Sequence, residues 1–134
     1  QFLRLYYWIL YAAYINDPMA EVTRYTHKEE LAFRFMHYII EEHSPDKDVT
    51  YYARKLGLSA KSLTNLIRSI SGQSARDWIV FYTIFEIKTL LRDSSLDIKA
   101  IAARTHFPDH ATLSRYFRRY TGMTPTKYRE SFFF

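Results

Sequence analysis

The stretch LTNLIRSISG at residues 63–72 is followed fifty residues later by a stretch of the same pattern, LSRYFRRYTG at residues 113–122. In both, bulky apolar residues recur at positions i, i+3, i+4 and i+7, which is the spacing of one buried helix face. The opposite face carries hydroxyl, amide and guanidinium groups, and each stretch ends at a glycine, a common helix terminator. The sequence therefore predicts one helical unit that occurs twice.

The composition is that of a folded domain with its basic charge on one side of the sequence. The 134 residues are 48% hydrophobic and 25% charged, which excludes a disordered tail. Residues 1–49 hold 5 lysines and arginines against 8 acidic residues, whereas residues 50–134 hold 14 against 6. A basic segment of this kind is typical of nucleic-acid binding, although an anionic membrane surface would attract the same charge.

No residue pattern indicates catalysis, a cofactor or a metal. The chain has no cysteine, which excludes disulfides and thiolate ligands, and its three glycines cannot form a glycine-rich phosphate loop. His106 and His110 have a chelating spacing, but Pro108 lies between them and no third ligand follows. The remaining histidines have no nucleophile or carboxylate pattern around them: His27, His37 and His43. We therefore expect a protein that is not an enzyme.

The first residues form a separate aromatic segment. Residues 2–15 carry Arg4 as their only charge, and large residues recur there with the spacing of a coiled-coil seam, which predicts a helix. The segment is shorter than the ~20 residues that span a membrane. We expect residues 1–26 to be the remnant of an upstream dimerisation or sensor region and its linker, in a chain that is part of a longer protein. A membrane-surface role for this segment is the alternative.

Capping residues predict the other helices. A capping box at residues 26–29 begins a helix that ends near Ser44-Pro45, and a short helix covers residues 49–55. The repeated helices begin after Ser59 and Asp109. Further caps precede a short helix ending at Arg104 and a last short helix after Thr124-Pro125: Asp97 and Thr124.

A long helix is expected between the two copies. Ser74 and Asp77 have capping-box spacing, and the helix can run to about Arg92, so that it would span about 27 Å. The residues expected on its buried side are Trp78, Phe81, Phe85, Leu90 and Leu91. No run of residues reads as a strand, so the predicted fold is all-α.

Each repeated helix follows a short helix with helix-turn-helix spacing. In the first copy Ala53 allows two helices to cross closely, and Gly57, four residues later, takes a positive φ without steric cost. In the second copy Ala102 and His106 occupy these positions, with one extra residue in the turn. Histidine tolerates left-handed geometry better than most residues do.

When the two helix-turn-helix copies are taken together, residues 28–130 resemble the C-terminal DNA-binding domain of AraC/XylS-type transcription regulators. The matching residues are Tyr52-Ala53, Leu56-Gly57-Leu58-Ser59, Leu63, Gly72, Lys88-Thr89-Leu90-Leu91, Ile98, Ile101-Ala102, Phe107, Ser114-Arg115-Tyr116-Phe117-Arg118-Arg119, Thr121-Gly122-Met123-Thr124-Pro125 and Tyr128-Arg129. The family usually has glycine at the position of His106 and a small polar residue at that of Pro108, and these departures concern the second turn rather than the fold.

The resemblance implies two helix-turn-helix subdomains joined by a long linking helix, with the aromatic helix in front. The first subdomain with the linking helix would cover residues 27–92, and the second residues 93–134. The two recognition helices would enter successive major-groove segments of double-stranded DNA, 34 Å or roughly one helical turn apart. Such a regulator would be bacterial and cytoplasmic, and it would activate transcription more often than repress it. Its further partners would be RNA polymerase and a second copy of the protein, bound through the N-terminal helix.

The resemblance also assigns roles to side chains. The positions that match the family's base readers are Lys61, Thr64, Asn65, His110, Ala111, Ser114 and Arg115. Arg115 suits guanine, Asn65 suits adenine and Ala111 can touch a thymine methyl group. Phosphate contacts are expected from Ser59, Ser62, Arg68, Thr112, Arg118 and Arg119. Because the two sets of base readers differ, we expect an asymmetric pair of half-sites; the alternative is an all-α dimerisation or membrane-surface module.

Overall fold

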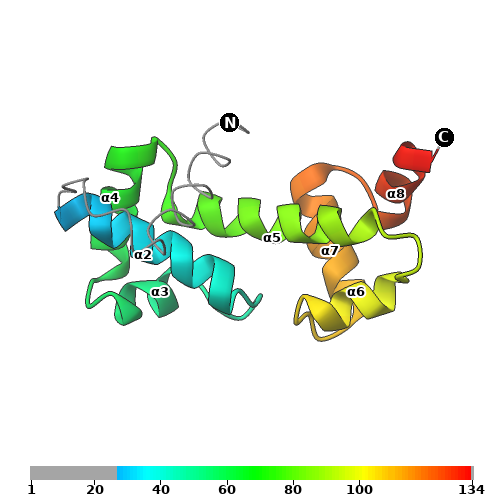
Figure 1. The fold of residues 1–134 in the computed structure, drawn as a ribbon, viewed down its shortest axis with the longest axis horizontal. Coiled ribbons are helices and arrows are strands. Elements are labelled where there is room, and N and C mark those ends of the chain that lie inside the picture. Colours follow the sequence, from blue (N-terminus) through cyan, green and yellow to red (C-terminus); the bar gives the residue numbers. More distant parts are fainter. Residues whose placement is uncertain (1–26, 134) are drawn as a thin grey trace, which may run out of the picture. The chain divides into compact units, whose positions relative to one another are not determined.

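The computed structural model describes residues 27–133, which are all-helical with no strand among them. The seven helices, labelled as in Figure 1, are α2 (His27–Glu42), α3 (Val49–Lys55), α4 (Ala60–Ser71), α5 (Ala75–Leu91), α6 (Ile98–Arg104), α7 (His110–Thr121) and α8 (Pro125–Phe133). The all-α fold predicted from the sequence is confirmed. The expected aromatic helix at residues 2–15 and the cap at Thr26 lie outside the described residues.

The described chain forms two compact units. One contains residues 27–42 and 48–76, and the other contains residues 43–47 and 77–133. The first unit packs α2, α3 and α4 together. Its core is formed by fully or nearly fully buried side chains: Leu31, Ala32, Phe35, Met36, Ile39, Tyr52, Ala53, Leu63 and Ile67. The rings of Phe35 and Tyr52 meet edge to face across this core, with centroids 5.8 Å apart.

The second unit repeats this plan with α6 and α7 packed against α5. Its core residues are Ile87, Leu91, Ile101, Ala102, Phe107, Leu113 and Phe117. Helix α8 is tied to the end of α5, because Arg129 donates from Nε to the carbonyl oxygen of Leu91 (2.9 Å) and from Nη2 to that of Asp93 (3.2 Å). These carbonyl groups lie where α5 ends and would otherwise lack an intrahelical donor.

The linking helix α5 buries a different face from the one predicted. Trp78 and Leu91 are buried as expected, and Phe81 and Leu90 are half-buried, but Phe85 is 40% exposed and that part of the prediction is wrong. The buried stripe instead recurs at every fourth residue: Ile79, Thr83, Ile87 and Leu91. Apolar residues occur on all sides of this helix, so their periodicity gave no basis for choosing its core face.

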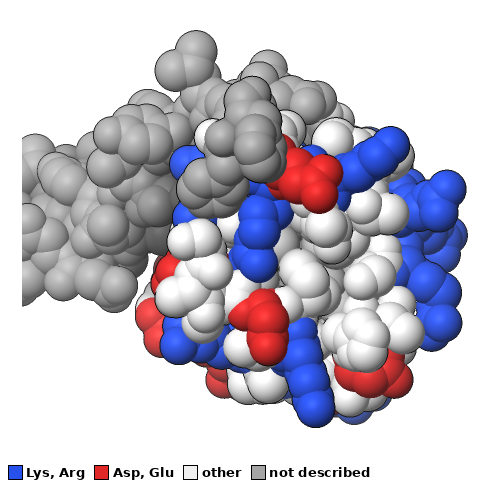
Figure 2. All heavy atoms as spheres, turned by 90° about the vertical axis from the view of Figure 1, so that its right-hand side faces the viewer, with Lys and Arg blue, Asp and Glu red and all other residues white. Residues whose placement is uncertain are grey.

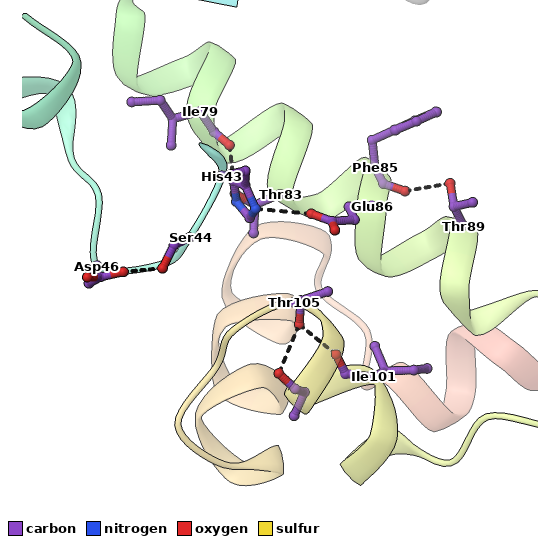
Figure 3. Close-up of polar contacts among 11 residues, drawn as sticks. His43, Ser44, Asp46, Ile79, Thr83, Phe85, Glu86, Thr89, Ile101 and Thr105 are labelled. Carbon is purple, nitrogen blue, oxygen red and sulfur yellow. Dashed lines mark hydrogen bonds and ion pairs between the residues drawn. The ribbon is translucent and has the colours of Figure 1, made fainter. Parts of the chain in front are cut away.

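His43 forms a buried polar cluster with α5 (Figure 3). Its Nε2 lies 2.6 Å from Thr83 Oγ1, and its Nδ1 lies 3.0 Å from Glu86 Oε2 in an ion-pair contact. The Thr83 hydroxyl also donates to the carbonyl oxygen of Ile79 (2.8 Å), one turn earlier. Through these contacts with α5, residues 43–47 belong to the second unit. Helix α2 before them and helix α3 after them belong to the first.

Candidate nucleic-acid interface

The turn between α3 and α4 is closed by backbone hydrogen bonds. Leu58 N–H donates to Ala53 O (2.9 Å) and Gly57 N–H donates to Arg54 O (3.2 Å). This pattern satisfies the last carbonyl groups of α3 and requires a left-handed residue just after the helix. Gly57 supplies it with a φ of 71°. Gly57 therefore supplies the backbone conformation that closes the turn before α4.

The turn between α6 and α7 has the same hydrogen bonds around a different residue. Phe107 N–H donates to Ala102 O (2.9 Å) and His106 N–H donates to Ala103 O (3.3 Å). His106 has a φ of 64°, and it is the one described residue other than glycine with a positive φ. The geometry expected for a helix-turn-helix is thus formed despite the missing glycine. Pro108 is the extra residue, and it precedes the cap of α7.

The two recognition helices begin at different caps. Ser59 Oγ accepts from Ser62 N–H (3.1 Å) at the start of α4, whereas Asp109 Oδ1 accepts from Thr112 N–H (2.7 Å) at the start of α7. The backbone N–H and then the hydroxyl of Thr112 hold the pKa of Asp109 below its usual 3.8, helped by the charge of Arg115. The first cap is therefore neutral and the second is an anion.

The residues expected to read bases lie on the side of each helix away from its core. On α4, Lys61 and Asn65 are exposed and Thr64 is half-buried. On α7 the corresponding residues are exposed, except for the half-buried Ser114: His110, Ala111, Ser114 and Arg115. The structure thus gathers each set on its own helix, and the two sets lie in different units.

The residues expected at phosphates are also accessible, with one exception. Ser59, Ser62, Arg68, Arg118 and Arg119 are exposed, and Arg119 lies over the ring of Tyr120, 5.5 Å from its centroid. Thr112 is half-buried, and its hydroxyl accepts a hydrogen bond from Arg115. Sequence reasoning missed this link, which the spacing of Thr112 and Arg115, three residues apart on one helix, could have indicated.

The charge around the second unit is predominantly basic. Figure 2 shows several Lys and Arg side chains along one edge of the face that it draws, and the acidic side chains lie elsewhere on that face. Among the described residues there is no cluster of three or more potential metal ligands. None of the described helices is long and apolar enough to cross a membrane.

Known proteins of similar sequence are transcription regulators. Residues 52–131 match the model of a family described as helix-turn-helix domain. The chain is 36% identical over 85 residues to the HTH-type transcriptional activator RhaR of Yersinia pseudotuberculosis serotype O:3, and 32% identical over 83 residues to RhaR of Cronobacter sakazakii. These matches cover 63% and 62% of the chain but only 29% of each relative. The chain therefore aligns with less than a third of the relatives' length.

Solved structures show the same fold. The C-terminal domain of the response regulator yesN from Fusobacterium nucleatum superposes with a TM-score of 0.66 at 24% identity, covering 78% of this chain and 99% of that one. The DNA-binding domain of AdpA, solved in complex with a target DNA, superposes with a TM-score of 0.63 at 24% identity, covering 76% and 91%. The family match over residues 52–131 and the similarity in sequence to the RhaR activators show that the chain belongs to the AraC/XylS-type family of helix-turn-helix transcription regulators.

Proposed function

We propose that this chain binds specific double-stranded DNA through α4 and α7, which read two half-sites of different sequence. The observation that carries the proposal is the pair of helix-turn-helix units with the same turn hydrogen bonds, each presenting an exposed polar helix face. The side chains on these faces differ, with Lys61, Thr64 and Asn65 on α4 and Arg115 among those on α7. Different donors and acceptors select different base pairs in the major groove, so the site should be asymmetric.

The linking helix supports the binding of both readers to one duplex. At 1.5 Å per residue the 17 residues of α5 extend over about 26 Å. With the flanking subdomains added, this length suits two readers in successive major-groove segments, about 34 Å apart. In this proposal α5 acts as a spacer, and one chain spans both half-sites.

Affinity would come from the exposed cations near the readers. Arg68, Arg118 and Arg119 are exposed on the recognition helices and can contact phosphates. Each neutralised phosphate releases counterions, so binding should weaken as salt rises. We place this activity in the cytoplasm and take the intact protein to be a regulator that recruits RNA polymerase.

The second candidate is an all-α dimerisation or membrane-surface module. The sequence of the aromatic segment 2–15 favours it, because aromatic residues at coiled-coil spacing are typical of a helix that packs against a partner. This segment would also serve homodimerisation of the intact regulator, so its presence alone does not distinguish the two functions. Removing the segment and measuring DNA binding does distinguish them.

The test is DNA binding of the chain and of a variant lacking residues 1–17, measured by fluorescence anisotropy with labelled duplex at several salt concentrations. Contacts from the three arginines alone predict a slope of log K against log salt of roughly −3. The shortened variant should retain most of the affinity. Binding that is insensitive to salt, or that is lost with residues 1–17, would contradict DNA reading by α4 and α7.

A further inference from the structure

Three side chains at the start of α7 form a chain of contacts. Asp109 caps the helix, Thr112 follows three residues later and Arg115 three residues after that. Asp109 Oδ1 accepts from the backbone N–H of Thr112 (2.7 Å), and Thr112 Oγ1 accepts from Arg115 Nη2 (3.4 Å). All three residues lie on one edge of the proposed reading face.

The Thr112 hydroxyl is fixed as an acceptor toward Arg115. A hydroxyl has two lone pairs that can accept, whereas a guanidinium group has donors only. In the 3.4 Å contact the hydrogen bond therefore runs from Arg115 Nη2 to Thr112 Oγ1. The backbone N–H of Thr112 is separately held by the Asp109 carboxylate.

The corresponding positions on α4 lack this chain of contacts. The residues there are Ser59, Ser62 and Asn65, and Ser59 Oγ donates to Ser62 Oγ (2.9 Å) at a neutral cap. The Asn65 side chain has no hydrogen bond with any residue of the described chain. The contact between Thr112 and Arg115 is thus a property of α7 and not of the repeated unit.

The contact leaves Arg115 able to bind a base. A guanidinium group has five N–H donors in a planar fork, and the bond to Thr112 uses one of them. The remaining donors are sufficient for bidentate pairing with O6 and N7 of guanine. An arginine held in one orientation loses less rotamer freedom on binding and has less access to alternative acceptors such as phosphates.

We propose that Thr112 is a positioning residue, which orients Arg115 toward the base edge and thereby sets base preference at one position of the DNA site. The inference rests on the proposed function, in which Arg115 reads a base. It gives Thr112 a different role from the phosphate contact expected from the sequence. Asp109 takes part by accepting from the backbone N–H of Thr112, which holds that residue in the first turn of α7.

The test compares Thr112→Val with Thr112→Ser. Valine keeps the branched shape and the backbone N–H that Asp109 binds, but it removes the hydroxyl; serine keeps the hydroxyl. Affinities are measured for the duplex selected by the wild-type chain and for duplexes changed at the base pair whose preference Arg115→Ala abolishes. Loss of one hydrogen bond of this kind should reduce discrimination roughly three-fold in Thr112→Val, with little change for the altered duplexes. Thr112→Ser should retain the wild-type preference.

Two controls separate positioning from other roles. In an Arg115→Ala background, Thr112→Val should cause no further loss of preference. Ser62→Ala, the matched change on α4, removes an expected phosphate contact and should lower the affinity for all duplexes alike, with the base preference at the Arg115 position intact. An equal loss for all duplexes in Thr112→Val would indicate a phosphate contact, and an unchanged preference would indicate no contribution; either result overturns the proposal. A wild-type chain without any base preference would instead refute the proposed function.

Discussion

The two helix-turn-helix units share their backbone design and differ in the side chains placed upon it. Both turns have a hydrogen bond of 2.9 Å between corresponding residues, from Leu58 to Ala53 and from Phe107 to Ala102. Both have a left-handed residue, yet glycine occupies that position in the first unit and His106 in the second. The backbone of the turn is thus kept while its residues differ.

The recognition helices diverge more than the turns do. Helix α4 begins at a neutral serine cap and carries Lys61 and Asn65, whereas α7 begins at an anionic cap that is linked through Thr112 to Arg115. Among the described residues, Thr112 bonds to the cap through its backbone N–H and to Arg115 through its hydroxyl, and α4 has no corresponding contact to Asn65. If the two helices read bases as proposed, Arg115 on α7 has a partner that fixes its orientation, and the side chain of Asn65 on α4 has no such contact among the described residues.

The largest effect should come from removing matched core leucines. Leu63 and Leu113 are both fully buried at the same position of α4 and α7. Replacing either with alanine leaves a cavity and should lower the free energy of unfolding by about 2–5 kcal/mol. Because the residues lie in different units, hydrogen exchange measured by mass spectrometry should increase mainly in the unit that carries the change. Equal increases in both units would show that they unfold as one.

DNA binding should separate Arg115 from Arg118, which lie on the same helix. Arg115→Ala should cost about 1–3 kcal/mol at its preferred base pair and relax the choice there. Arg118→Ala should weaken all duplexes to a similar degree, because phosphates carry no sequence information. Affinities for a set of single-base variants of the site measure both effects. Uniform losses from both substitutions would refute this division of roles.

Substituting the left-handed residue of each turn should change the free energy of unfolding by less, and with opposite sign in the two units. Left-handed geometry costs a non-glycine residue roughly 1–2 kcal/mol, and glycine's greater freedom in the unfolded chain offsets part of this. His106→Gly should therefore stabilise the protein by about 0.5–1 kcal/mol. Gly57→Ala should destabilise it by a similar amount. An added Cβ would meet no atom within 4 Å, so the cost comes from the left-handed backbone alone. Urea unfolding measures both, and a stabilising Gly57→Ala would contradict the comparison.

The smallest effect concerns the charged cap and its dependence on pH. The pKa of Asp109 is lowered in the folded state, so the ionised cap contributes stability above its usual pKa of 3.8, which is lost as the pH falls through the folded value. Asp109→Asn keeps a capping oxygen without the charge. The melting temperature of wild type should exceed that of Asp109→Asn at pH 7, and the gap should close below pH ~4. Ser59→Asn on α4 is the control. The difference in melting temperature between wild type and this variant should not change with pH in this range.

Much of the fold could be predicted because local signals and tertiary packing agree. Ser59, Asp97 and Asp109 cap the helices that the sequence predicted they would begin, and Gly72 and Gly122 end α4 and α7 with φ values of 77°. The candidate reading faces were likewise visible, because the buried residues Leu63, Ile67, Leu113 and Phe117 define the opposite side.

The remaining features depend on tertiary contacts that periodicity does not report. The sequence predicts Phe85 on the buried side of α5, but the packing of this helix buries Thr83 and Ile87 instead. His43 showed no local pattern, since its partners Thr83 and Glu86 lie about forty residues away. The contact between Thr112 and Arg115 is permitted by their spacing on one helix, but whether it forms depends on the rotamers of both side chains, which the residue types do not specify.

Selection of bound sites from random double-stranded DNA tests the central claim that two units of one fold read different bases. The account predicts an asymmetric site whose two half-sites have different sequences and lie about one helical turn apart. It further predicts that Arg115→Ala alters one half-site and Asn65→Ala the other. A site made of two identical half-sites, a change in the same half-site from both substitutions, or no enrichment of any sequence would contradict it.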